Sequence, residues 1–93
     1  MWFVYILRCK DNSLYVGICY DLEKRIKDHN SGKYKGSYTK GRLPVALVYW
    51  KKLKDRYEAA RREKEIKGWS KAKKLKLINN VENRKKTFNQ LEK

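Results

Sequence analysis

The feature of this sequence that most invites chemistry is a carboxylate on the side of a helix that should otherwise face inward. Helical spacing places Glu63 in an inward stripe with Ala59, Ala60, Ile66 and Lys67. Burying a carboxylate is costly unless it is paired or binds a metal ion. Two alternatives therefore stay open: Glu63 is a metal ligand, or it forms a structural ion pair with a cation such as Arg25.

Four further polar side chains could join this carboxylate in a site for phosphodiester hydrolysis: Tyr5, Tyr15, Arg25 and His29. A carboxylate can hold a hard divalent cation, and an arginine can clamp a phosphate in its bidentate fork. A tyrosine or histidine can accept a proton from the attacking water. The simpler alternative is that the two tyrosines are ordinary core residues beside a bulge glycine, Gly17.

A predicted β-hairpin positions the two tyrosines. Residues 2–9 and 14–19 have the composition of strands and flank the polar turn 10–13. If the strands pair about Asn12, alternation of side chains places Tyr5, Tyr15 and Gly17 on one face. The other face then carries the aliphatic residues Val4, Ile6, Leu14, Val16 and Ile18. A glycine inside a strand often marks a close approach by another group.

The remaining elements are predicted from caps and apolar periodicity. Asp21 has the features of an N-cap for a helix to about residue 30, which carries Arg25 and His29 on one face and stops at Gly32. Residues 45–50 predict a strand buried on both faces. Asp55 starts a second helix that Gly68 ends, and Ser70 starts a third. These elements predict one domain over residues 1–80, followed at 81–93 by a basic polar tail or short helix.

The charge balance predicts an anionic partner. Among 93 residues there are 25 Lys and Arg against 10 Asp and Glu, a formal net charge of +15. Nucleic acid is the commonest such partner, and an anionic membrane surface is the alternative. The basic loop 31–43, with its interleaved aromatic residues, suits phosphates and unstacked bases. The predicted nucleic-acid contacts are Lys33, Lys35, Tyr38, Lys40, Arg42, Lys67 and Lys74.

The sequence shows no signal peptide and no run long enough to span a bilayer, which predicts a cytoplasmic protein without a membrane partner. In that compartment Cys9 and Cys19 are expected to be free thiols. Two cysteines and one histidine do not make a zinc site.

The order and spacing of these residues resemble the GIY-YIG nuclease superfamily, and in particular its small stand-alone bacterial members. The resemblance covers roughly residues 2–78. The first motif is similar to Val4-Tyr5-Ile6-Leu7, and the second is similar to Tyr15-Val16-Gly17. The family arginine matches Arg25, its following Tyr-or-His position matches His29, and its metal-binding glutamate matches Glu63.

This resemblance implies an α/β fold with a small three-stranded antiparallel sheet flanked by helices, in the order β-β-α-β-α-α. It implies single-metal cleavage of DNA, with Mg²⁺ or Mn²⁺ held by Glu63, in DNA repair or recombination. Arg25 would hold the scissile phosphate and Tyr15 would be the first candidate for general base. Tyr5 and His29 would position the water or relay its proton. Lys74 resembles a lysine of the small members.

Two departures from the family pattern bear on this assignment. Cys19 stands where many members have a threonine, and a thiol is the weaker hydrogen-bond donor. The asparagine that many larger members carry after the glutamate helix has no counterpart here. Two other classes therefore stay open, a non-catalytic nucleic-acid-binding module and a protein-interaction module. RNA stays open as an alternative to DNA, and so does the oligomeric state.

Overall fold

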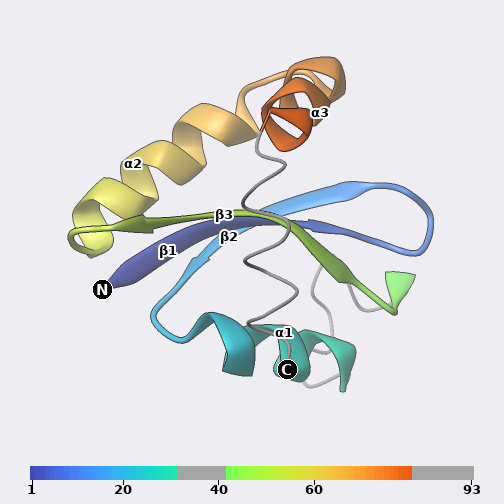
Figure 1. Ribbon diagram of the computed structural model, residues 1–93, viewed down its shortest axis with the longest axis horizontal. Helices are drawn as coiled ribbons and strands as arrows, with labels where there is room; N and C mark the ends of the chain where they lie inside the picture. The colour runs from blue at the N-terminus through green and yellow to red at the C-terminus, as the bar shows by residue number, and fades with distance from the viewer. Residues whose placement is uncertain (32–41, 81–93) are drawn as a thin grey trace.

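The computed structural model describes residues 1–31 and 42–80 (Figure 1). The elements are β1 (Trp2–Arg8), β2 (Leu14–Cys19), α1 (Leu22–Asn30), β3 (Ala46–Leu53), α2 (Arg56–Lys67) and α3 (Lys71–Asn79). The predicted order β-β-α-β-α-α and the three-stranded antiparallel sheet are therefore confirmed. The predicted stop at Gly32 and the predicted tail at 81–93 lie outside the described residues.

The sheet has the strand order β2-β1-β3, so β1 is central and pairs antiparallel with both neighbours. In the hairpin, Tyr5 lies opposite Gly17 and Arg8 opposite Leu14, which centres the turn on Asp11. The prediction that the strands pair about Asn12 is therefore wrong. Asn12 instead takes the left-handed backbone conformation inside the turn, with φ of 69°. Moving the turn centre from Asn12 to Asp11 shifts the pairing of the two strands by two residues. A shift by an even number of residues leaves every side chain on its predicted face.

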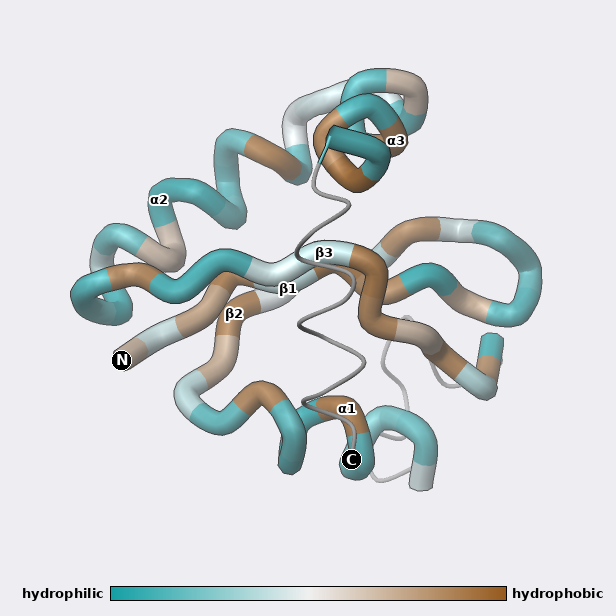
Figure 2. The backbone as a smooth tube through the Cα atoms, in the orientation of Figure 1, coloured by the Kyte–Doolittle hydropathy of each residue, from teal (hydrophilic) through white to brown (hydrophobic). Residues whose placement is uncertain are grey.

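The two faces of the sheet are covered by different helices. Figure 1 shows α1 on one side of the sheet and α2 with α3 on the other. The α1 face carries a core cluster that includes Tyr5, Leu7 and Leu22, and the opposite face carries one that includes Ile6 and Ile66. Figure 2 shows apolar residues concentrated along the strands, whereas the hairpin turn and most helical positions are hydrophilic. The sheet thus separates two small cores.

All three predicted helix starts are confirmed by their caps. The side chains of Asp21, Asp55 and Ser70 accept hydrogen bonds from the backbone N–H groups three residues later. Each such cap stabilises its helix by about 1 kcal/mol. Within the two described ranges, none of the helices is long and apolar enough to cross a membrane.

The third strand is longer than predicted and has an irregular pairing. It continues to Leu53, and its register with β1 shifts between Ile6 and Leu7. Leu47 belongs to the core on the α1 face and Tyr49 to the core on the α2 face, as predicted for a strand buried on both sides.

Both cysteines are buried free thiols, as expected. Burial raises the pKa of the Cys19 thiol to about 11, although the nearby charge of Arg25 opposes this shift. Cys19 is therefore a protonated core residue at neutral pH.

Candidate active site

Two phenols and an imidazole meet on the α1 face of the sheet. The ring centroids of Tyr5 and Tyr15 are 6.3 Å apart, and that of His29 is 6.5 Å from Tyr5 and 5.4 Å from Tyr15. The hydroxyl of Tyr5 lies 3.4 Å from Nε2 of His29. Tyr5 is fully buried and His29 is only 3% exposed, whereas Tyr15 is partly exposed. Tyr15 is therefore the member of this group that a ligand can reach most easily.

Gly17 makes room for this arrangement. It lies directly opposite Tyr5 in the sheet, and the Tyr5 ring crosses the space that a side chain at position 17 would fill. A Cβ placed on Gly17 would come within 2.7 Å of the Tyr5 hydroxyl and 3.0 Å of Cε2 of Tyr15. The sequence predicted a close approach at this glycine, and the group that approaches is Tyr5 itself.

Arg25 brings positive charge to the same group. It lies four residues before His29 on α1, and its charge acts on Tyr5, Cys19 and His29. Asn30, the next residue after His29, fixes the end of the helix. Its amide donates to the carbonyl of Val45 and accepts from the Val45 N–H. Asn30 is a positioning residue that periodicity alone did not reveal, because its partner is fifteen residues away in the chain.

The protonation states follow from burial. Desolvation raises the pKa of Tyr5 above its ordinary value, Tyr15 adds to this shift and Arg25 opposes it. Desolvation lowers the pKa of His29, the charge of Arg25 lowers it further, and Asp28 opposes both. Tyr5 is therefore a neutral phenol and His29 a neutral imidazole at pH 7. The Tyr5 hydroxyl and Nε2 of His29 are hydrogen-bond partners, and the tautomer of the neutral imidazole decides which of the two donates.

This protonation state predicts a loss of stability in mild acid. Because the pKa of His29 is lower in the folded chain than in the unfolded chain, the unfolded chain binds a proton first as the pH falls below about 6.5. The stabilisation is complete above that pH and is lost as the pH falls through the folded-state pKa. Urea unfolding between about pH 7.5 and pH 5 should show this decline in the wild type and a flatter profile in His29→Gln. Equal profiles would contradict the assignment.

Glu63 lies in a different layer of the molecule. It belongs to α2, whose buried residue Ile66 packs in the core on the face opposite the two phenols. Its carboxylate is 3.3 Å from Nζ of Lys67, with the two side chains 22% and 54% exposed. In the described part of the chain its ion-pair partner is thus Lys67 and not Arg25. The expectation that Lys67 faces inward is wrong, because its side chain extends to solvent.

The side of α2 that carries Glu63 nevertheless faces the edge of the sheet formed by β2. Helical spacing puts Glu63 on the same side as Arg56, whose guanidinium lies 5.7 Å from the Trp2 ring. Trp2 in turn contacts Tyr20, which directly follows β2. Because β2 is an edge strand, no other strand lies beyond it. Only this edge therefore separates the Glu63 side of α2 from the face of the sheet that carries the two phenols.

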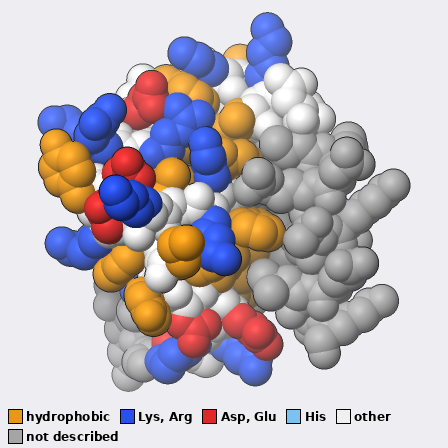
Figure 3. Space-filling model, turned by 60° about the vertical axis from the view of Figure 1, so that its left-hand side comes forward, with side chains coloured by type: hydrophobic (Ala, Val, Ile, Leu, Met, Phe, Trp, Pro, Cys, Tyr) orange, Lys and Arg blue, Asp and Glu red, His pale blue; other side chains and the backbone are white. Residues whose placement is uncertain are grey.

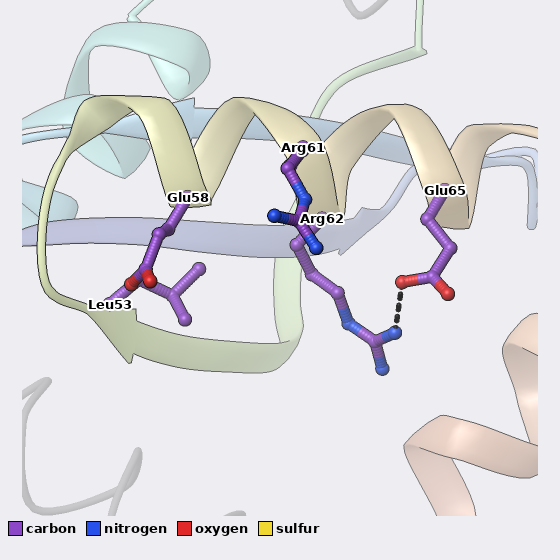
Figure 4. Close-up of a pocket in the computed structure, with 5 residues that line it drawn as sticks. All are labelled: Leu53, Glu58, Arg61, Arg62 and Glu65. Atoms are coloured by element: carbon purple, nitrogen blue, oxygen red, sulfur yellow. Dashed lines mark hydrogen bonds and ion pairs between the residues drawn. The ribbon is translucent and has the colours of Figure 1, made fainter.

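The other side of α2 forms an open pocket against β3. The pocket has a volume of about 430 Å³ and is lined by Leu53, Glu58, Arg61, Arg62 and Glu65 (Figure 4). Its two glutamates and two arginines balance in charge, and Arg62 pairs with Glu65. None of the predicted site residues lines this pocket, so it is separate from the phenol cluster.

The predicted nucleic-acid contacts have mixed placements. Four of them, Lys33, Lys35, Tyr38 and Lys40, lie outside the described residues. Arg42 pairs with Asp11 of the hairpin turn, with 3.0 Å between Nε and the carboxylate. Lys67 pairs with Glu63, and Lys74 is partly buried on α3.

Comparison with known families assigns the chain. The family model of the GIY-YIG catalytic domain matches residues 1–76, which include all six elements except the end of α3. The chain belongs to the GIY-YIG family. The match spans Tyr5, Tyr15, Arg25, His29 and Glu63 in one domain.

Relatives of this GIY-YIG chain are small proteins of similar length. A UPF0213 protein of Staphylococcus haemolyticus is 53% identical over 76 residues, which are 82% of this chain and 92% of that protein. A UPF0213 protein of Clostridium perfringens is 51% identical over 78 residues, which are 84% of this chain and 83% of that protein. The solution structure of a UPF0213 protein from Bacillus halodurans is similar with a TM-score of 0.57 and 44% identity, covering 87% of this chain and 86% of that one.

Proposed function

We propose that this GIY-YIG domain is a divalent-metal-dependent endonuclease that hydrolyses DNA phosphodiester bonds. The observation that carries the proposal is the meeting of Tyr5, Tyr15 and His29 on one face, with the charge of Arg25 acting on the same group. Phenols, a neutral imidazole and a guanidinium together suit an anionic phosphate and a water that must lose a proton.

Each of these residues has a distinct role in the proposed reaction. Arg25 binds the scissile phosphate and stabilises the charge that builds on it during attack. Tyr15 accepts the proton of the attacking water on its phenolate oxygen, directly or through a second water, after that oxygen has released its own proton to solvent. Tyr5 and His29 are positioning residues, because both are buried and hydrogen-bonded to each other. The water oxygen bonds to phosphorus, the bond to the leaving sugar oxygen breaks, and that oxygen takes up a proton.

The donor set fits one hard cation. Residues 1–31 and 42–80 contain no group of three or more His, Cys, Asp or Glu that could enclose a metal ion. Mg²⁺ or Mn²⁺ would therefore be held by Glu63, several waters and a phosphate oxygen, a common arrangement for Mg²⁺. The pair with Lys67 is partly exposed to solvent, so it is weak enough to exchange for such an ion. A bound cation would supply charge neutralisation at the leaving oxygen.

A second candidate function is a nucleic-acid-binding module without hydrolysis. It is favoured by the ion pair between Glu63 and Lys67 and by the position of Glu63 on the helix layer opposite the phenols. In this account the basic surface binds nucleic acid and the carboxylate is structural.

Conservative changes at the two phenols test the proposed roles. Labelled duplex, branched and single-stranded DNA would be incubated with Mg²⁺ or Mn²⁺ and the cleavage rates compared. Tyr15→Phe is expected to lower the rate about 10²-fold or more, as removal of a general base does. Tyr5→Phe should lower it less, because Tyr5 acts through His29. No cleavage by the wild type on any substrate, or equal rates in wild type and Tyr15→Phe, would contradict the proposal.

A further inference from the structure

One end of the molecule carries an exposed tyrosine, Tyr20, beside a partly buried tryptophan and an arginine. Trp2 starts β1 and lies edge-on to Tyr20, with 5.9 Å between ring centroids. Arg56 lies over the Trp2 ring at 5.7 Å. Tyr20 is 66% exposed, so a large apolar ring faces solvent in a protein of net charge +15.

The chain topology builds this surface. The hairpin register places Tyr20 opposite Trp2 as the next pair beyond β2, on the α2 side of the sheet. The connection from β3 to α2 then brings Lys54 and Arg56 to the same end. Figure 1 shows the start of β1, the turn into α1 and the turn into α2 gathered there. Figure 3, which brings this end forward, shows hydrophobic side chains interleaved with Lys and Arg, with some Asp and Glu side chains among them.

The surface also adjoins the candidate active site from both helix layers. Tyr20 leads directly into α1, where Arg25 lies one turn beyond the cap at Asp21. Arg56 and Glu63 share one side of α2 and are separated by about 10 Å of helix. A nucleic-acid strand that crosses the sheet edge formed by β2 near Glu63 would therefore reach the Trp2–Tyr20 pair.

We propose that Trp2, Tyr20 and Arg56 form a stacking platform for unpaired nucleotides next to the scissile phosphate. A base stacks on the exposed ring of Tyr20, which Trp2 contacts edge-on, while Arg56 and Lys54 contact the backbone phosphates. Bases in a duplex are already stacked on one another and do not offer their faces. The platform thus deepens the proposed function, on which it rests, by assigning a substrate that contains a single-stranded segment beside the cleavage point.

The test measures binding without cleavage. A fluorescently labelled thymidine oligonucleotide of about 12 nucleotides is titrated with protein in EDTA, and anisotropy gives the affinity. Tyr20→Ala is expected to weaken binding about tenfold, as loss of one stacked base does. Tyr20→Phe should retain the wild-type affinity, because stacking needs the ring and not the hydroxyl. Arg56→Gln should weaken binding and reduce its dependence on salt.

Tyr57→Ala is the matched control. Tyr57 is 71% exposed at the same end, but it has no ring contact within the described residues. It should bind the oligonucleotide like the wild type, and duplex DNA should bind equally to the three tyrosine variants. Equal losses in Tyr57→Ala and Tyr20→Ala, or wild-type affinity in Tyr20→Ala, would overturn the platform. The platform would also be overturned if Tyr20→Ala bound the oligonucleotide normally and lost affinity only for anionic vesicles or for a protein partner.

The platform and the nuclease proposal can fail separately. Binding in EDTA does not depend on hydrolysis, so loss of binding in Tyr20→Ala with no cleavage by the wild type would sustain the platform and reject the enzyme. Metal-dependent cleavage by the wild type, together with unchanged oligonucleotide binding in Tyr20→Ala, would sustain the enzyme and reject the platform.

Discussion

Replacement of Glu63 by glutamine is expected to abolish metal-dependent DNA cleavage while the fold and the DNA affinity are retained. Glutamine keeps the size of the side chain and removes the charge that a cation needs. If metal stabilises the transition state by several kcal/mol, the cleavage rate should fall about 10³-fold or more. The measurement is the cleavage rate of labelled DNA over a range of Mn²⁺ concentrations, with affinity measured in EDTA.

Glu65→Gln provides a matched control for this change. Glu65 lies two residues further along α2, on the side that faces the pocket against β3, and pairs with Arg62. Its loss should leave cleavage within about twofold of the wild type, since an exposed ion pair contributes little. Retained cleavage in Glu63→Gln, or an equal loss in Glu65→Gln, would contradict the role of Glu63 as the metal ligand.

Gly17→Ala is expected to destabilise the chain and disturb the site together. Its Cβ would lie 2.7 Å from the Tyr5 hydroxyl and 2.8 Å from Cζ, closer than such atoms can approach. The Tyr5 ring must then move, and it is fully buried against the core. Overpacking of this kind costs about 1–3 kcal/mol in unfolding free energy. Urea denaturation measures the loss, and the cleavage rate should fall as Tyr5 leaves His29.

Gly68→Ala is the control for an added methyl group. Gly68 has φ of −79°, which alanine adopts readily, and its Cβ would meet backbone oxygens at 3.5 Å or more. The expected result is unchanged or slightly raised stability, because alanine restricts the unfolded chain. If Gly17→Ala were equally harmless, Tyr5 would not need the space that Gly17 leaves.

Local chemistry made much of the fold predictable. Asp21, Asp55 and Ser70 each cap a helix because their short side chains reach the N–H groups of the first turn. Alternation assigned Tyr5 and Gly17 to one face although the turn centre was misplaced, because side-chain direction depends only on whether the register shift is odd or even. The length of β3 was less predictable, since its exposed end at Lys51 and Lys52 pairs with β1 through the backbone.

The site was harder to predict than the fold because its residues come from different layers. Periodicity shows which side of a helix is buried, but not which face of the sheet that helix covers. Four of the predicted residues, Tyr5, Tyr15, Arg25 and His29, lie together because the hairpin and α1 are consecutive in the chain. Glu63 belongs to α2, on the other side of the sheet, where it pairs with Lys67. Helical spacing alone did not show that the Lys67 side chain is exposed.

The most direct test of the central claim is paramagnetic broadening by Mn²⁺, measured on the backbone amide signals of the protein. If one cation site joins the two helix layers at the β2 edge, Mn²⁺ should broaden the amides of Tyr15 and Arg25 together with that of Glu63. The same signals should stay sharp in Glu63→Gln. Broadening confined to Glu63 and Lys67, with Tyr15 and Arg25 unaffected, would mean that the carboxylate and the phenol face do not share a metal site.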